Sequence, residues 1–121
     1  RFALTDESSA SDIFKEYCLR LNEGDTKLLL KKLAPTRLVI NSFRDRVEAA
    51  EGRGASAEEL RELLGRGRAK KGIFEGDLEE GELEIGQVAA LFRRRQSVDE
   101  VMKELLEGYR RASDKIRSAG L

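Results

Sequence analysis

The stretch EGDLEEGELEIGQ, residues 75–87, combines residue types that could bind a metal ion or line a ligand pocket. It holds six carboxylates and three glycines in thirteen residues, with no basic residue. Carboxylate oxygens bind divalent cations, but a calcium loop needs Asp or Asn at alternate positions and a closing Glu, which this spacing does not provide. We therefore expect a solvated acidic loop without a metal ion. The acidic residues concerned are Asp77, Glu79, Glu80, Glu82 and Glu84.

Two basic runs, RGRAKK at 66–71 and RRR at 93–95, contain the residue types that grip phosphate. Neither run is interleaved with aromatic residues on which a base could stack. Across the chain, 23 Lys and Arg balance 23 Asp and Glu, so no global field draws it to nucleic acid or to an anionic membrane. We expect solvated basic faces, with neither nucleic acid nor a membrane as partner. An RNA-associated domain stays open as a hypothesis that would use Arg66, Arg68, Lys70, Lys71, Arg93, Arg94 and Arg95.

Histidine is absent from the chain, which removes the commonest general base near neutral pH and the commonest metal ligand. Catalysis by this chain alone would need a carboxylate, a tyrosine or a lysine. The one cysteine, Cys18, lies in an apolar helical pattern, where a small core residue is more frequent than a nucleophile. Tyr17 and Tyr109 also lie on apolar helix stripes, so packing explains them. No residue is assigned a catalytic or metal-binding role.

Length and composition set further limits. With 121 residues, the chain predicts one domain of about half the length of a (β/α)8 barrel. No apolar run approaches the roughly 18 residues of a membrane span, and a single cysteine fits a reducing compartment. We therefore expect a soluble, cytoplasmic protein. The chain begins at Arg1 without an initiator Met, and we expect it to be cut from something longer.

The first half of the chain predicts two helices and a strand. Ser9 or Ser11 caps a helix that ends at Gly24. Residues 26–33, TKLLLKKL, are predicted to form a short strand. Thr36 is predicted to cap a second helix. The apolar stripe of the first helix comprises Ile13, Phe14, Tyr17, Cys18 and Leu21, and that of the second comprises Val39, Ile40, Phe43 and Val47.

Two capping boxes predict helices in the second half, because Ser at the N-cap and Glu three residues later satisfy otherwise unpaired N–H groups. Ser56 with Glu59 predicts a short helix, and Ser97 with Glu100 predicts a long one. Between them, closely spaced glycines predict an extended loop over 72–87. We expect the apolar stripe of the long helix to be core. Its members are Val98, Val101, Met102, Leu105, Leu106, Tyr109, Ala112 and Ile116.

The segment EIGQVAAL, residues 84–91, opens an apolar helical run with a glycine and an amide. The first N–H groups of a helix have no intrahelical partner, so those of Gly86, Gln87 and Val88 could meet an oxygen of a ligand. They could also close a loop of the protein itself. Both interpretations stay open on these residues alone.

Two long segments resemble the C-terminal part of the nitronate monooxygenase (2-nitropropane dioxygenase) family, which includes the FMN-dependent enoyl-acyl-carrier-protein reductase of bacterial fatty acid synthesis. The segments are RFALTDESSASDIFKEYCLRLNEGDTKLLLKKLAPTRLVINSFRDRV and GRGRAKKGIFEGDLEEGELEIGQVAAL. The specific marks are RF…ES at Arg1, Phe2, Glu7 and Ser8, EGD at 75–77, and GQVAAL from Gly86.

The resemblance implies a fold that is mainly α with at most one or two short strands, formed by the tail of an FMN-bearing TIM barrel and its helical covering domain. Residues 1–24 would be the end of the last βα unit. Residues 25–96 would be the covering domain with its glycine-rich acidic loop at 72–87. Residues 97–121 would form a C-terminal amphipathic helix that closes the fold.

The same resemblance implies where the site lies. Arg1, Gly86 and Gln87 would be near the FMN, and Glu84 and Ile85 would line the substrate pocket. The family's glycine-rich phosphate turns and its catalytic histidine lie upstream of this chain. We therefore expect the chain alone to be inactive and not to hold FMN.

Three functions stay open. The resemblance implies an FMN-dependent oxidoreductase that oxidises nitronates or nitroalkanes, with enoyl-acyl-carrier-protein reduction as the alternative within the family. The amphipathic C-terminal helix instead favours a free-standing helical interaction module. The RNA-associated domain is the third. In the longer enzyme the expected partner is a small-molecule substrate, and a homodimer stays open.

Overall fold

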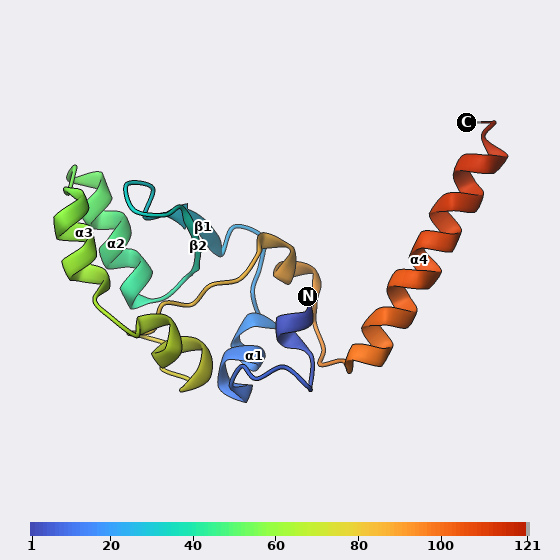
Figure 1. Cartoon of the computed structure of the whole chain (residues 1–121), viewed down its shortest axis with the longest axis horizontal. Coiled ribbons are helices and arrows are strands. Elements are labelled where there is room, and N and C mark those ends of the chain that lie inside the picture. Colours follow the sequence, from blue (N-terminus) through green and yellow to red (C-terminus); the bar gives the residue numbers. More distant parts are fainter. Residues whose placement is uncertain (121) are drawn as a thin grey trace.

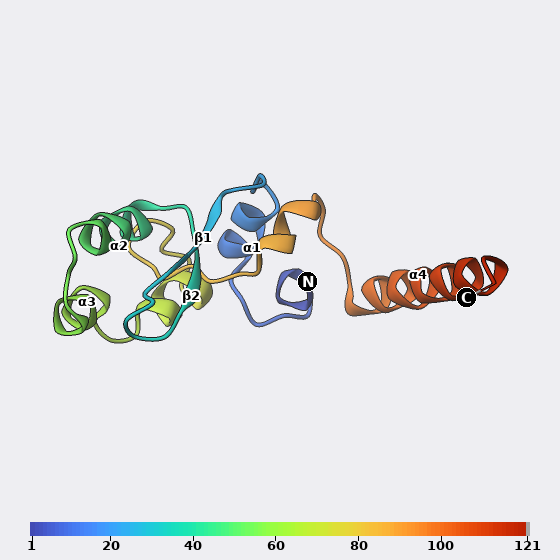
Figure 2. The same ribbon diagram turned by 90° about the horizontal axis from the view of Figure 1, so that it is seen from above.

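A computed structural model describes residues 1–120, which form a mainly helical chain with one two-stranded antiparallel sheet. The sequence prediction of a mainly α fold with at most two short strands is confirmed. Helices α2 and α3 and the hairpin lie at one end, α1 lies in the middle, and α4 extends away from the other end (Figure 1). A view turned by a right angle keeps this elongated order (Figure 2).

Helix α1, Asp12–Cys18, follows a 3-10 turn at Phe2–Leu4. The Ser11 hydroxyl accepts a hydrogen bond from the Phe14 N–H, as the capping prediction required. The stripe prediction was only partly correct, because Ile13 is 54% exposed whereas Lys15 is buried. The Lys15 ammonium donates to the Ser8 carbonyl at 2.8 Å and to the Asp6 carbonyl at 3.3 Å. These acceptors allow a lysine to be buried on this face.

Strands β1, Thr26–Leu29, and β2, Thr36–Val39, form the hairpin, with Thr26 opposite Val39. The prediction of a helix starting at Thr36 was therefore wrong. Four residues are too few to show a period, and the β1 backbone supplies the hydrogen bonds that an extended segment needs. The predicted strand at 26–33 was too long, because Leu30 takes a left-handed φ of 56° and ends it.

Helix α2, Ser42–Gly52, begins five residues later than predicted because Asn41 is its N-cap, accepting a hydrogen bond from the Arg44 N–H. Helix α3, Ala57–Leu64, has the predicted capping box at Ser56. Two clusters of buried apolar residues pack between the hairpin, α2 and α3. They comprise Leu29, Leu30, Leu38, Phe43 and Val47, and Ala50, Ala55 and Leu60.

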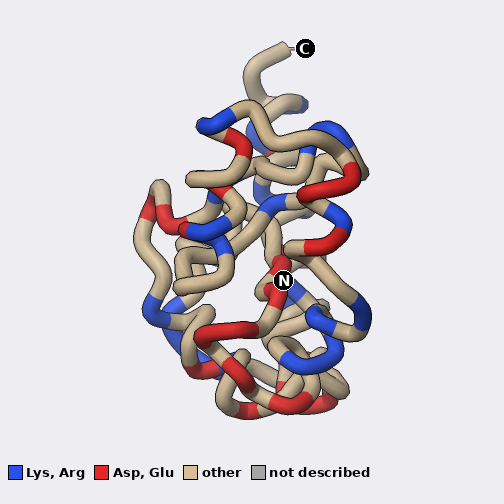
Figure 3. The backbone as a smooth tube through the Cα atoms, turned by 90° about the vertical axis from the view of Figure 1, so that its left-hand side faces the viewer, with Lys and Arg blue, Asp and Glu red and all other residues tan. Residues whose placement is uncertain are grey.

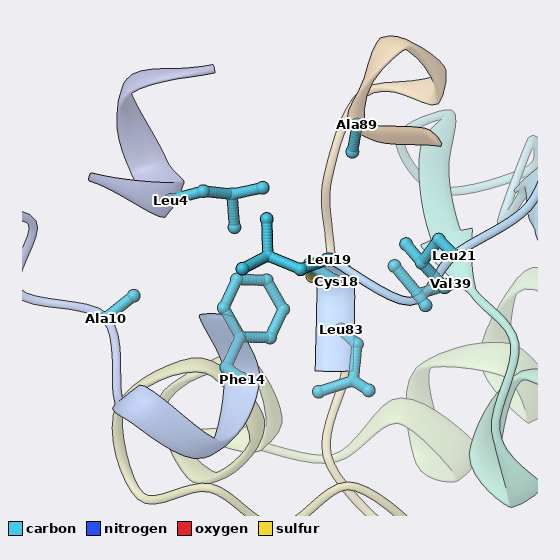
Figure 4. Packing of buried hydrophobic residues seen from close by; sticks show 9 residues of the cluster. All are labelled: Leu4, Ala10, Phe14, Cys18, Leu19, Leu21, Val39, Leu83 and Ala89. Atoms are coloured by element: carbon cyan, nitrogen blue, oxygen red, sulfur yellow. The ribbon is translucent and has the colours of Figure 1, made fainter. Parts of the chain in front are cut away.

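The largest apolar cluster joins α1 to segments much later in the chain (Figure 4). Side chains from both sides of residue 24 share this core, and the division of the chain into units stays a prediction. Cys18 is fully buried in this cluster, which confirms it as core. The cluster comprises Leu4, Ala10, Phe14, Cys18, Leu19, Leu21, Val39, Leu83 and Ala89.

Helix α4, Val98–Ser118, has the predicted capping box at Ser97. Apart from Val101, its apolar stripe is not core in this chain. Val101 is 1% exposed, but Leu105 is 44% and Tyr109 is 72% exposed, because the helix projects beyond the other elements (Figures 1 and 2). Packing therefore does not explain Tyr109. Periodicity predicted an apolar face, but it could not predict whether a neighbour covers that face.

Candidate functional site

The predicted extended loop over 72–87 is extended only after Gly81, because the residues up to Gly81 form a compact turn. A π-helical turn at Lys70–Phe74 brings Gly72 against Gly81. A Cβ on Gly81 would lie 2.2 Å from the Gly72 Cα, so this approach excludes larger residues. Gly76 has φ of +82°, which favours glycine for a second reason. The sequence had recognised the glycines but not that two of them contact each other.

The side chains of Asn41 and Arg68 hold this turn. The Asn41 amide donates to the carbonyl oxygens of Leu78, at 3.0 Å, and Gly81, at 2.8 Å. Arg68 donates to the Glu80 carbonyl and lies 4.4 Å from the centre of the Phe43 ring. The turn is thus fixed to the start of α2.

Three of the six carboxylates of the acidic loop, those of Glu75, Asp77 and Glu80, are paired within the chain. Asp77 accepts hydrogen bonds from the N–H groups of Glu79 and Glu80, and the Glu80 bond is the main cause that holds the pKa of Asp77 below its ordinary value. Glu80 is paired with Arg46 through two hydrogen bonds of 2.8 and 2.5 Å, which lower the pKa of Glu80. Over residues 1–120, no three His, Cys, Asp or Glu side chains gather as a metal site.

After the turn, an extended segment leads past β2. The Val39 N–H donates to the Leu83 carbonyl at 2.8 Å, and Leu38 forms an antiparallel bridge with Glu84. Leu83 is buried and Glu84 is exposed, so the alternation of an extended chain turns the Glu84 side chain outward. This pairing with β2 fixes the position at which residues 85–87 start.

Four of the five residues expected at the flavin and substrate lie together on this edge. Ile85 packs partly against the core, whereas Glu84, Gly86 and Gln87 are exposed. A hollow of about 370 Å³ is bordered by Glu84, Ile85 and Gly86, and a larger one of about 720 Å³ is bordered by Gln87. Both hollows are also bordered by Arg37, which the sequence analysis missed because it took residues 36–41 for a helix.

Gly86 precedes a short 3-10 helix at Gln87–Leu91, in place of the longer helical run that was expected. Its φ of −67° is ordinary, and a Cβ on it would have no heavy atom within 4 Å. Unlike Gly72 and Gly81, it is not required by backbone strain or by contact within the described residues. Space is therefore left beside its backbone.

Arg1 is engaged at the opposite end of this segment. Its guanidinium pairs with Glu104, donates to the Gln96 side chain at 3.3 Å and lies 5.0 Å from the centre of the Phe92 ring. Arg1 thereby links the chain start to α4. The structure does not bring Arg1 to the hollows that Gln87 and Glu84 border.

Burial changes two titrating groups. Burial raises the pKa of the Cys18 thiol to about 12, which leaves it protonated and unreactive near neutral pH. Burial, followed by the nearby Glu84 carboxylate, raises the pKa of Glu82 to about 7. Glu82 is 8% exposed, so the charged form is poorly solvated.

The basic runs are not simply solvated faces. Arg68 donates to the carbonyls of Leu63 and Leu64, and Arg95 is paired with Asp6 and Asp12. Basic and acidic positions are interspersed along the backbone in Figure 3. Whether nucleic acid is a partner stays a prediction.

The marks that carried the resemblance have structural roles. Both carboxylate oxygens of Glu7 accept from the Val98 N–H at the start of α4, at 3.1 and 2.9 Å. Asp77 closes the turn described above.

None of the helices formed by residues 1–120 has the length and apolar character to cross a bilayer.

Comparisons with known proteins agree on one family. The family model described as nitronate monooxygenase matches residues 1–108. The solved structure of FabK from Thermotoga maritima is similar over 98% of this chain, with a TM-score of 0.84 and 26% identity. Its M276A mutant is similar at a TM-score of 0.78 and 23% identity over 98% of this chain and 35% of its own, a likeness that concerns the fold alone.

The extent of the match is unequal. This chain covers 37% of the length of the Thermotoga maritima FabK chain. A search of curated proteins gave no match.

Proposed function

This chain belongs to the nitronate monooxygenase family, and from that premise we propose that it forms the C-terminal part of an FMN-dependent oxidoreductase. The observation that carries the proposal is the family match over residues 1–108, with a similarity to FabK that includes α4. In this proposal the chain supplies the tail of a TIM barrel, the helical domain that covers the flavin and the closing helix. The rest of the barrel is supplied by the longer protein.

In this proposal, residues 84–87 line one edge of the flavin ring. Gly86 leaves space beside its backbone, and Gln87 presents an exposed amide that makes no hydrogen bond within the described residues. Arg1 does not present a free guanidinium to a phosphate, because it is already paired with Glu104. Its role at the cofactor stays a prediction.

FMN, when bound, supplies the electron transfer, and the protein supplies position and surroundings. Gln87 would donate to or accept from a polar ring atom and so orient it. Ile85, anchored in the core, would exclude water from the substrate side. No proton-transfer step is assigned to this chain.

We propose nitronates as the substrate class, and enoyl thioesters of acyl carrier protein as the alternative. The experiment uses the protein expressed from the complete open reading frame that encodes this chain. A flavin absorption band together with oxygen uptake dependent on a nitronate supports the first activity. Oxidation of a nicotinamide cofactor dependent on an enoyl thioester supports the second. A colourless protein inactive in both assays would contradict the oxidoreductase proposal.

The exposed apolar face of α4 favours a second candidate, a helical interaction module. Its apolar residues recur at alternating steps of four and three, the spacing of a coiled-coil seam, at Val98, Met102, Leu105, Tyr109, Ala112 and Ile116. In the oxidoreductase proposal this face packs on the barrel of the same protein. Hydrogen exchange distinguishes the two. Slow exchange of α4 amides in the longer protein, and fast exchange in the 121-residue chain, supports the barrel.

A further inference from the structure

The larger hollow beside Gln87 combines two guanidinium groups with apolar side chains. Arg37 from β2 and Arg93 from the segment before α4 both border this space of about 720 Å³. Val88 and Leu91 border it too and are 46% and 76% exposed. The hollow therefore offers positive charge next to an apolar surface.

Both guanidiniums lack a carboxylate partner. Within residues 1–120, no carboxylate oxygen lies within 4.0 Å of Arg37 or Arg93, whereas Arg94 and Arg95, next in sequence, are each paired with acidic residues. Glu23 is the one acidic residue that borders the same hollow, so two positive groups face one negative group. The net local charge favours an anion.

The two side chains are held by neutral oxygens and keep donors free. The Arg37 Nη1 lies 3.4 Å from the Thr26 carbonyl and 3.3 Å from its hydroxyl. The Arg93 Nη1 donates to the Leu21 carbonyl at 2.6 Å. Each arginine is thus tethered through one nitrogen, and its other N–H groups remain for a ligand.

Arg37 also borders the hollow that contains Glu84, Ile85 and Gly86. It therefore lies between the two spaces that flank the edge assigned above to flavin and substrate. A group bound by Arg37 would be next to Gln87.

We propose that Arg37 and Arg93 bind the oxyanion of the substrate and determine specificity for anionic compounds; this rests on the proposed function. Planar guanidinium groups match the paired oxygens of a nitronate or a phosphate, and Val88 and Leu91 accept the adjoining carbon chain. The oxyanion is either a nitronate or the phosphate on the carrier arm of an enoyl thioester.

The test measures binding to the 121-residue chain by nuclear magnetic resonance, with backbone amides and arginine Nε–H groups observed. The probes are propane-1-nitronate, neutral 1-nitropropane and 4′-phosphopantetheine. Either anion should give saturable shifts at Arg37, Arg93 and Gln87 that weaken with added salt, and 1-nitropropane should not. Tighter binding of propane-1-nitronate would identify a nitronate as the bound oxyanion. Tighter binding of 4′-phosphopantetheine would identify the phosphate of the carrier arm.

Variants test the two arginines separately. Arg37→Met and Arg93→Met should each weaken anion binding by about tenfold, the loss expected for one charge-assisted hydrogen bond. Arg37→Lys should retain part of the affinity, because lysine keeps the positive charge but lacks the planar pair of N–H donors of a guanidinium. The control Arg53→Met changes an exposed arginine at the end of α2 and should leave binding unchanged.

Three results would overturn the proposal. They are the absence of saturable shifts with both anions, equal shifts with neutral 1-nitropropane, and an equal loss in Arg53→Met. Unchanged amide dispersion in each variant establishes that it is folded. Because this assay needs neither flavin nor turnover, its failure is separate from a failure of the oxidoreductase assays.

Discussion

Gly72 and Gly81 lie with their backbones in contact, so that a Cβ on Gly81 would be 2.2 Å from the Gly72 Cα and 2.4 Å from the Asp77 carbonyl oxygen. This contact accounts for one glycine in the EGDLEEGELEIGQ stretch. Gly76 has a left-handed φ, and only Gly86 has open space around it. The glycines therefore serve different purposes.

Gly81→Ala is expected to destabilise the chain by at least about 1–3 kcal/mol, the usual range for overpacking, since both contacts are with backbone atoms that cannot move aside cheaply. Urea denaturation followed by circular dichroism measures this. Gly86→Ala is the matched control and should stay within about 0.5 kcal/mol. Equal effects of the two changes would mean that the close contact does not exist.

Asn41 caps α2 and ties it to the acidic turn, so Asn41→Ala should cost about 1–3 kcal/mol. Asn41→Ser retains a capping oxygen but loses the amide that donates to the Leu78 and Gly81 carbonyls. We expect Asn41→Ser to lower the free energy of unfolding by an intermediate amount in the same denaturation assay. If the serine variant were as stable as the parent chain, the link to the turn would contribute nothing.

Glu82 should make stability depend on pH. Its folded-state pKa is raised from 4.5 to about 7, so the native state favours the protonated form. This contribution is fully present below pH 4.5 and is lost as the pH rises through about 7. Glu82→Gln should therefore be more stable than the parent chain above pH 7, by about 1–3 kcal/mol, and the difference should shrink toward pH 4.5.

Thermal melts across this pH range measure the difference between the two proteins. Glu62→Gln, an exposed change on α3, is the control and should give a small difference that does not vary with pH. A Glu82→Gln curve parallel to that of the parent chain would show that the Glu82 carboxyl is well solvated.

The two ends of the α4 stripe should respond differently. Val101→Ala is expected to cost about 1–3 kcal/mol in the 121-residue chain because Val101 is 1% exposed. Leu105→Ala should cost less than about 1 kcal/mol there, since Leu105 is 44% exposed. In the longer protein, the cost of Leu105→Ala should rise to about 2–5 kcal/mol if the barrel covers this face. Denaturation of both proteins measures it, and an unchanged small cost would favour an interaction module.

The isolated chain should purify without colour and bind FMN weakly or not at all. Phosphate capture needs several convergent N–H groups, and Arg1 is occupied by Glu104 and Gln96. Visible absorption after dialysis against FMN-free buffer is the measurement. A flavin band that stays with the chain would contradict the assignment of the phosphate grip to the rest of the barrel.

In the longer protein, Gln87→Ala should keep the flavin band while changing turnover or substrate affinity, because Gln87 is assigned to the ring edge and not to the phosphate. Steady-state kinetics with the better of the two substrates test this. Glu62→Ala, remote on α3, is the control. Kinetics of Gln87→Ala identical to those of the control would remove Gln87 from the site.

The sequence grouped residues 84–87 into one candidate site only through family resemblance, and their roles at a flavin or substrate stay a prediction. Glu84, Ile85, Gly86 and Gln87 do lie on one exposed edge beside two hollows. Arg37 could not be predicted, because it joins that edge across the β2 pairing, and no spacing in the sequence indicates which strand will lie there.

By itself, the sequence determined only local features, the helix caps among them. The capping boxes at Ser56 and Ser97 and the cap at Ser11 involve groups three residues apart, and any chain with those residues can form them before it folds further. The tertiary structure alone decided the contact of Gly72 with Gly81 and the reach of Asn41 to the same turn. It also decided that Thr36–Val39 is a strand and that most of the apolar face of α4 is exposed to solvent. These outcomes depend on which distant backbone or surface lies opposite, and a local pattern does not carry that information.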